Sequence, residues 1–301
     1  MELDSNSVST YQSVRVLGTR VDVITQAALE AEISARLAGA RLCRVAKLNA
    51  EFLMRAADDP EFAAYLENSD LNIADGAGVV WAARFLSLPT TSRAGLRAFQ
   101  VVGQALVSLV ALLLRPAYCR GPLPERIPGV EALHTMLEAA VETRSPVFFF
   151  GSKAEVNQRA RELLARQHPG LIIAGGCHGY QPDSEAPLRQ IEASGARLLI
   201  VALGSPKQEY WIRDHGKALS TVRVAVGEGG SLDFIAGDSR RAPRWMQERG
   251  LEWLWRLLMN EDRTGRKSRP RRAWDSVPRF IWRVVVWKLR HGARQGALDA
   301  P

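Results

Sequence analysis

The chain of 301 residues has few cysteines and no dinucleotide-binding turn, and both absences limit what it can be. Cys43, Cys119 and Cys177 are three scattered thiols without C-x-x-C spacing, so neither a disulfide framework nor a zinc site is predicted, and a reducing compartment is expected. The segment after the first expected strand has one glycine, Gly18, where a G-x-G-x-x-G turn needs three. This disfavours an NAD-dependent oxidoreductase.

An apolar leader is also missing, and acidic residues are scarce toward the end of the chain. Residues 1–13 are polar, so we expect no signal peptide and a flexible N-terminus there. Between Arg263 and Arg294 there are about eleven Lys or Arg and one acid, Asp275, roughly +10 in a chain whose total is +8. The excess positive charge therefore belongs to a C-terminal appendage at 246–301, outside the expected core at 14–245.

Short apolar runs alternate with segments of helical periodicity, which is typical of a parallel sheet with helices between its strands. We expect strands at 14–17, 21–23, 42–48, 71–74, 147–150, 171–174, 198–203 and 222–226. We expect helices at 24–37, 50–66, 78–86, 130–141 and 154–167, the first two beginning at Thr25 and Asn49. The pattern predicts a doubly wound, mainly parallel, Rossmann-like α/β sheet with helices on both faces and a basic helical C-terminal appendage.

An apolar helical insertion is expected at 88–121. Residues 98–114 contain no charged residue, but Gln104 and Ser108 interrupt the run. A span would also place the two halves of one α/β domain on opposite sides of a bilayer, so we reject it. The helix either packs on the protein or lies in a membrane interface, and both alternatives remain open.

The tail combines apolar, aromatic and basic residues on one expected helix. Aliphatic and aromatic residues recur at helical spacing among basic ones: Val277, Phe280, Ile281, Val284 and Val285 beside Trp282 and Trp287, with Arg279, Arg283, Lys288 and Arg290 interleaved. Such a helix suits an anionic membrane surface. Bulky aliphatic residues have no role on a phosphate backbone, so we favour a peripheral membrane contact over nucleic acid.

Polar residues follow two neighbouring strands of the expected sheet. Asp75 and Gly76 come directly after the run at 71–74, and Asn49 follows the run at 42–48. Ligands of open α/β sheets bind beyond the carboxyl ends of the strands. Asp75 is therefore a candidate acid–base group, although it could instead only cap the next helix.

Small and cationic residues follow other strands. They are Gly151 and Ser152, Lys207 and Gln208, and Gly229 and Gly230. Exposed amides at a helix start can hold a diphosphate, and glycines let a nucleotide approach the backbone. Asp233 either caps its helix or binds a ribose, and His178 either contacts the nucleotide or is structural.

Several motifs in series point to a family. They are Asn49-Ala-Glu51, Asp75-Gly-Ala-Gly-Val-Val-Trp81, Leu123-Pro-Glu-Arg126-Ile-Pro-Gly129, Gly204-Ser-Pro-Lys207-Gln208-Glu209, Gly229-Gly-Ser-Leu-Asp233-Phe234, Arg241-Ala-Pro243 and Glu252-Trp-Leu-Trp-Arg256-Leu257. In this order, over roughly 14–263, the chain resembles the WecG/TagA/CpsF glycosyltransferases, bacterial enzymes of the N-acetylmannosaminyltransferase type. It departs from them at Lys47, where the family usually has Thr, and in a longer segment at 87–121.

The resemblance implies transfer of a sugar from a UDP-sugar donor, with inversion and without a metal or other cofactor. The acceptor would be a polyprenyl-diphosphate-linked sugar, used for a surface polysaccharide or a teichoic-acid-type linkage. The protein would act as a peripheral protein at the cytoplasmic face of the cell membrane, where the C-terminal appendage helps to complete the site. The alternative is a non-catalytic nucleotide-sugar-binding subunit of a polysaccharide assembly complex. A homo-oligomer is compatible with either.

For this reaction we predict that Asp75 takes the proton of the acceptor hydroxyl, while Asn49 and Gln208 orient sugar hydroxyls. No D-x-D pair lies at a suitable strand end, so arginines are expected to neutralise the leaving diphosphate in place of a metal. The residues predicted to bind the donor and its diphosphate are Lys47, Gly76, Gly151, Ser152, Lys207, Gly229, Gly230, Asp233, Arg241, Arg256 and Arg263. Arg126 and His178 are predicted to contact the acceptor or another part of the substrates.

Overall fold

The computed structural model describes residues 11–180, 183, 185–237, 242–243, 246, 255 and 271–292. Its main sheet has six parallel strands in the order β4-β3-β8-β7-β5-β6. The strands are β3 (Cys43–Leu48), β4 (Leu71–Ala74), β5 (Val147–Gly151), β6 (Ile173–Cys177), β7 (Leu198–Ala202) and β8 (Val224–Gly227). The predicted parallel α/β sheet is therefore confirmed.

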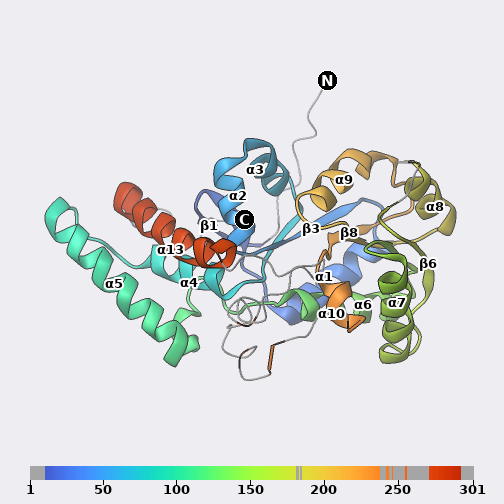
Figure 1. Cartoon of the computed structure of the whole chain (residues 1–301), viewed down its shortest axis with the longest axis horizontal. Helices are drawn as coiled ribbons and strands as arrows, with labels where there is room; N and C mark the ends of the chain where they lie inside the picture. The colour runs from blue at the N-terminus through green and yellow to red at the C-terminus, as the bar shows by residue number, and fades with distance from the viewer. Residues whose placement is uncertain are drawn as a thin grey trace.

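Helices cover both faces of this sheet, as Figure 1 shows with α2, α3 and α9 above the strands and α1 and α6 below. They are α1 (Gln26–Ala38), α2 (Ala50–Asp58), α3 (Pro60–Glu67), α6 (Gly129–Glu142), α7 (Ala154–Gln167), α8 (Ala186–Ser194), α9 (Lys207–His215) and α10 (Ser231–Ile235), with a 3-10 helix η2 (Gly216–Ala218). Successive side chains of a strand point to opposite faces. Phe149 accordingly packs with Leu29 and Leu133, while Phe148 packs with Ile212 on the other face.

Two expected elements differ from the structure for local reasons. The predicted helix at 50–66 is broken into α2 and α3, because Asp59 caps α3 by accepting hydrogen bonds from the amides of Glu61 and Phe62, and Pro60 opens the new helix. The strand predicted at 171–174 is β6, shifted to Ile173–Cys177, where Gly175 and Gly176 pair with β5. The predicted caps Thr25 and Asn49 are confirmed.

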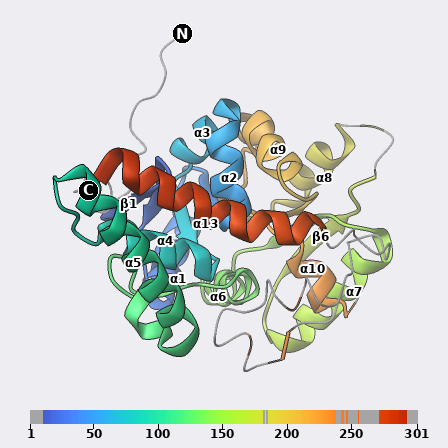
Figure 2. The same ribbon diagram turned by 60° about the vertical axis from the view of Figure 1, so that its left-hand side comes forward.

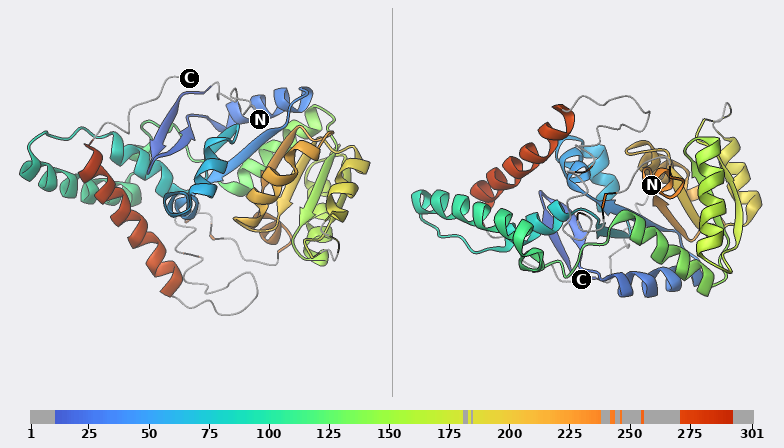
Figure 3. Two further views of the ribbon diagram at one scale, coloured as in Figure 1. Left: turned by 90° about the horizontal axis from the view of Figure 1, so that it is seen from above. Right: turned by 60° about the horizontal axis from the view of Figure 1, so that its bottom comes forward.

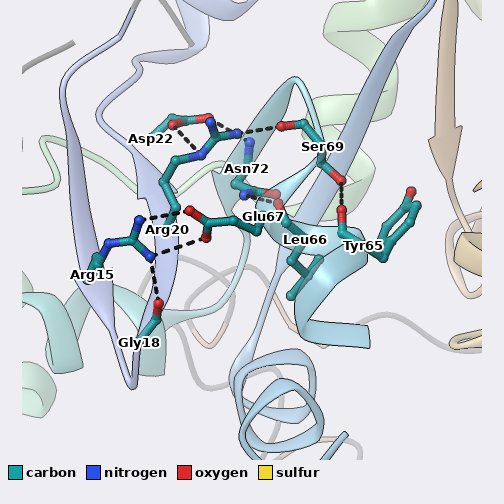
Figure 4. A network of polar contacts seen from close by, with 9 residues as sticks. All are labelled: Arg15, Gly18, Arg20, Asp22, Tyr65, Leu66, Glu67, Ser69 and Asn72. Atoms are coloured by element: carbon teal, nitrogen blue, oxygen red, sulfur yellow. Dashed lines mark hydrogen bonds and ion pairs between the residues drawn. The ribbon is translucent and has the colours of Figure 1, made fainter. Parts of the chain in front are cut away.

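A hairpin of β1 (Ser13–Val16) and β2 (Thr19–Asp22) pairs antiparallel outside the main sheet and braces β4 (Figure 4). The fully buried carboxylate of Asp22 accepts a hydrogen bond from the amide of Asn72 at 2.7 Å and lies 3.4 Å from Arg20 Nε. Arg20 also donates to the carbonyl of Ser69 at 2.5 Å. Because Asn72 lies within β4, this network fixes the strand that ends at Asp75.

The predicted insertion consists of α5 (Ala94–Leu114) and the 3-10 helix η1 (Pro116–Cys119), which follow α4 (Ala77–Ser87). The described part of the appendage is one helix, α13 (Arg271–His291), which lies along α4, α2 and α5 (Figure 2). Figure 3 shows α5 and α13 together at one end of the molecule, beyond the sheet.

The side chains of α13 face the protein more than its composition suggested. Phe280 and Val284 are buried, and the rings of Phe280 and Trp81 lie 6.3 Å apart. Lys288 is also buried, donating to the carbonyl of Phe85 and to Gln104 Oε1. Val284, one of the aliphatic residues that favoured a membrane over nucleic acid, is therefore covered by the protein itself.

Candidate active site

The carboxyl ends of five strands meet along one edge of the sheet. Three predicted site residues follow them, Asn49 after β3, Asp75 after β4 and Ser152 after β5; Gly204 follows β7 and Glu228 follows β8. The order β4-β3-β8-β7-β5 makes these ends neighbours in space. The structure therefore brings residues as far apart in the sequence as Asn49 and Glu228 to the edge where open α/β sheets bind ligands.

Asp75 is held by backbone groups from two directions. Its amide donates to the carbonyl of Leu48 at 2.9 Å, and its Oδ1 accepts from the amide of Gly129 at 2.8 Å. The residue at the start of α4 is Gly76, which makes no side-chain capping bond, so the interpretation of Asp75 as a cap of that helix is wrong. The Oδ2 atom takes no hydrogen bond from the residues that the structure describes, and the side chain is partly exposed. One oxygen is thus held by a backbone amide, while the other has no hydrogen-bond donor among the described residues.

Lys47 and Glu228 form a buried ion pair beside Asp75. Lys47, from β3, is 8% exposed, and its ammonium contacts the Glu228 carboxylate and donates to the carbonyl of Gly129 at 3.3 Å. Burial raises the pKa of Glu228, which the charge of Lys47 partly offsets and the nearby charge of Asp75 reinforces. Gly129 thus joins the two groups, since it binds Asp75 through its N–H and Lys47 through its C=O.

Gln208, in the first turn of α9 after β7, is buried, with only 4% of its surface exposed. Its Oε1 accepts from the amide of Gly204 at 3.1 Å, and its Nε2 donates to Glu209 Oε1 at 2.7 Å. A Cβ on Gly229 would lie 2.8 Å from Gln208 Oε1 and 2.8 Å from Gly204 Cα, so only glycine fits there. Gln208 therefore fixes the loops after β7 and β8, whereas Lys207 beside it is exposed at the start of α9.

The turn after β5 has a strained backbone. Ser152 adopts a φ of 58°, which is unusual for a residue other than glycine, and its Oγ donates to Asp233 Oδ1 at 3.1 Å. Its carbonyl accepts from the amide of Gly179 at 3.0 Å, which places the loop after β6 beside the turn. A Cβ on Gly151 would lie 2.5 Å from the carbonyl oxygen of Ala202, so β7 leaves no room for a side chain there.

The remaining candidates take different positions. Asn49 Oδ1 caps α2 by accepting from the amide of Phe52 at 3.1 Å. Arg126 is half-buried, and the next amide, of Ile127, donates to the carbonyl of Ala74 at 2.8 Å, so this segment runs beside the end of β4. His178 Nδ1 accepts from the amide of Tyr180 at 3.2 Å, which closes a local turn.

Three predicted arginines, Arg241, Arg256 and Arg263, lie outside the described residues. Within the described part of the chain, no three His, Cys, Asp or Glu side chains gather closely enough to hold a metal ion.

Sequence reasoning overlooked Glu228, Ser231 and the peptide group of Gly129. Ser231 lies close enough to Glu228 to lower the pKa of that carboxyl, which partly offsets the rise from burial. A signal was present, because Lys47 is the second-last residue of a strand that is otherwise largely apolar and Glu228 follows an apolar strand directly. Two opposite charges at the ends of adjacent strands are what a buried pair needs, but their adjacency depends on the strand order.

The comparisons with known proteins agree with this arrangement. The sequence matches the glycosyl transferase WecG/TagA/CpsF family over residues 14–106 and 101–294. It is 30% identical over 237 residues to the N-acetylglucosaminyldiphosphoundecaprenol N-acetyl-beta-D-mannosaminyltransferase of Bacillus spizizenii, covering 79% of this chain and 76% of the relative.

Two further proteins of the same name are similar to this chain. The one from Bacillus subtilis is 28% identical over 241 residues, covering 80% of this chain and 78% of the relative. The one from Staphylococcus aureus MRSA252 is 32% identical over 170 residues, covering 56% and 63%. The resemblance seen in the motifs is thereby confirmed. The chain belongs to the WecG/TagA/CpsF family and is a glycosyltransferase.

Proposed function

We propose that the chain transfers a sugar, with inversion, from a UDP-sugar to a polyprenyl-diphosphate-linked sugar during assembly of a surface polysaccharide or a teichoic-acid-type linkage. The printed name of its Bacillus and Staphylococcus relatives describes transfer of a sugar to an N-acetylglucosaminyldiphosphoundecaprenol, which supports a lipid-linked acceptor. The observation that carries the proposal is Asp75 at the end of β4, whose Oδ1 accepts from the amide of Gly129 while its Oδ2 takes no hydrogen bond from the described residues.

In the proposed reaction the acceptor hydroxyl oxygen attacks the anomeric carbon of the donor. Its proton passes to Asp75 Oδ2, and the bond between the anomeric carbon and the phosphate oxygen breaks, so that UDP leaves with the electron pair. A positioned base of this kind contributes about 10²–10⁴-fold to the rate. We propose that Asn49 Nδ2 donates a hydrogen bond to a sugar hydroxyl, because Asn49 Oδ1 already accepts the capping bond of α2.

The leaving diphosphate requires positive charge and amide donors. We propose that Arg126, Arg241, Arg256, Arg263 and the exposed Lys207 supply the charge. The turn at 151–152 and the glycines at 229–230 would receive the nucleotide, with Asp233 contacting the ribose beside Ser152.

Lys47 has a different part in this proposal. Its ammonium is already paired with Glu228 and donates to the carbonyl of Gly129. Because the amide of Gly129 donates to Asp75, we assign Lys47 to the positioning of that carboxylate and not to the leaving diphosphate.

The two substrates also suggest where the protein acts. A water-soluble UDP-sugar and a lipid-linked acceptor meet only at a membrane surface. We therefore propose a peripheral protein at the cytoplasmic face of the cell membrane.

The test is UDP release from a panel of UDP-sugars with a lipid-linked N-acetylglucosaminyl diphosphate as acceptor, with and without a chelator. The proposal expects acceptor-dependent UDP release that a chelator does not reduce. Binding of a UDP-sugar without release, under all acceptor conditions, would indicate the non-catalytic subunit instead. Release abolished by the chelator would contradict the role given to the arginines.

A further inference from the structure

Helix α5 exposes a long apolar face. Among the most exposed side chains are Phe99 (84% exposed), Leu106 (62%) and Leu114 (76%). The face is completed by Leu96, Val102, Val107, Val110 and Leu113, each at least half exposed. The stripe continues into η1, where an apolar hollow of about 420 Å³ lies between the last turns of α5 and Tyr118. Contiguous exposed apolar surface of this kind marks a contact with a membrane or another protein.

The opposite face of α5 is fastened to the protein. Ser108 is fully buried, and its Oγ accepts a hydrogen bond from Trp81 Nε1 at 2.9 Å. Gln104 Oε1 accepts from Lys288 of α13 at 2.7 Å, and Val101 is buried between these helices. By length and composition Gly95–Leu114 could cross a membrane, with a mean hydropathy of 1.7 and only 17% of that stretch buried. Contacts to α4 and α13 along one side hold it against the protein instead, so its outer face can lie in a membrane plane.

The charges around α5 identify the surface that it fits. From Gly76 to Pro124 the chain contains no acidic residue, while Arg84, Arg93, Arg97, Arg115 and Arg120 supply five positive charges. Four of these arginines lie near the ends of the apolar helix: Arg93 and Arg97 at its start, and Arg115 and Arg120 after its last residue. Anionic headgroups complement this pattern, because each cation near the surface adds to the attraction. A second copy docked on the same face would bring these arginines together, which disfavours a dimer there.

We infer that the outer face of α5 inserts into the interfacial layer of an anionic membrane, parallel to the surface, with the flanking arginines among the headgroups. An amphipathic helix of this kind sinks its apolar side about 5–10 Å into the headgroup boundary. Helix α13 packs beside α5 and exposes Trp282 (67%), a residue typical of that layer. The inference adds to the proposed function by naming the surface through which the enzyme would reach a lipid-linked acceptor.

The first test is sedimentation of the full chain with vesicles of phosphatidylglycerol and phosphatidylcholine, and with vesicles of phosphatidylcholine alone. We expect binding to the anionic vesicles, and a loss of about tenfold or more in the double variant Leu106→Asp/Val110→Asp, because two charges would enter the interface. Both side chains are exposed, so the fold should tolerate the change. The control is Ile172→Asp, an exposed apolar residue (44%) just before β6, which should bind like the unmodified protein.

A second test measures depth directly. The three native cysteines are buried, so a thiol at Phe99→Cys can be labelled selectively with an environment-sensitive fluorophore. Nitroxide groups attached to lipid tails should quench the label at position 99 and not one at Ile172→Cys. Wild-type binding by the double aspartate variant, or absence of quenching at position 99, would overturn the inference. A dimer in solution that the aspartates convert to monomer would assign the face to a second copy instead.

The outcome for the membrane can be separated from the outcome for the chemistry. UDP release with a short-chain, water-soluble acceptor should be the same in the double aspartate variant and in the unmodified protein. Loss of vesicle binding with intact turnover supports the inference. Absence of turnover in both proteins would count against the proposed function. The vesicle result would then still decide whether α5 contacts a membrane.

Discussion

Removing one member of the buried Lys47–Glu228 pair should destabilise the protein, and removing both should restore much of the loss. Lys47 is 8% exposed and Glu228 is 1% exposed, so either charge left alone would be isolated from water. Breaking a buried pair by deleting one partner costs about 3–5 kcal/mol, whereas replacing both is often nearly neutral. We therefore expect Lys47→Met and Glu228→Gln each to lower the free energy of unfolding by about 3–5 kcal/mol, and the double variant to lose clearly less than either.

The two single variants should also differ in their dependence on pH. In Lys47→Met, Glu228 loses its counter-charge while the repulsion from Asp75 remains, so its folded pKa rises further above the unfolded value. The folded state then keeps a proton that the unfolded state has released. Stability accordingly falls as pH rises above about 4.3, by up to about 1.4 kcal/mol per pH unit.

In Glu228→Gln the buried group that would retain the proton is gone, so this pH dependence should be absent, as it should be in the double variant. The assay is urea unfolding of the four proteins at several values between pH 5 and pH 9. Additive losses with parallel pH dependence would refute the coupling.

Two further predictions concern the frame around the site. Burial lowers the pKa of Lys288 to about 8, so between that value and its unfolded pKa the unfolded state holds a proton that the folded state lacks, and stability should rise with pH across this window. Between pH 7 and pH 10 the free energy of unfolding of the unmodified protein, relative to that of Lys288→Met, should therefore rise by about 2–3 kcal/mol. Urea unfolding measures this difference, and a difference that does not change with pH would contradict the prediction. Asp22→Ala leaves the buried amide of Asn72 without its acceptor and Arg20 without its ion-pair partner, and should lower stability by about 2–4 kcal/mol. The exposed ion pair of Glu67 provides the control, since Glu67→Ala should change stability by about 1 kcal/mol or less, and equal losses in the two variants would contradict the role of the Asp22 network.

Local patterns predicted much of the fold. Helix α7 has the expected bounds, and the run at 71–74 is the strand β4 that carries Asp75 at its end. Helical periodicity and apolar runs of strand length are properties of neighbouring residues, so a sequence without a structure is sufficient to recognise them. The break between α2 and α3 also has a local cause in the sequence. Asp59 is a typical N-cap residue and Pro60 a typical first residue of a helix, so together they start a new helix although the apolar periodicity continues.

The contacts that the sequence did not predict join elements that are far apart in the chain. Lys288 has the composition of a surface lysine, and it is buried only because α13 packs on α4 and α5. Glu228 pairs with Lys47 only because β8 lies next to β3 in the sheet. The capping interpretation of Asp75 failed because its carboxylate reaches the start of α6, 54 positions away, and not the helix that follows it. Such contacts follow from strand order and helix packing, which local periodicity does not determine.

The central claim is that Asp75 removes the proton from the incoming hydroxyl, and turnover of Asp75→Asn tests it most directly. The amide keeps the shape of the side chain and an oxygen for the Gly129 amide, so the variant should fold with nearly unchanged stability. Its rate of acceptor-dependent UDP release should fall by about 100-fold or more, while the exposed control Asp214→Asn stays active. A folded Asp75→Asn protein that releases UDP at the rate of the unmodified enzyme would contradict the account.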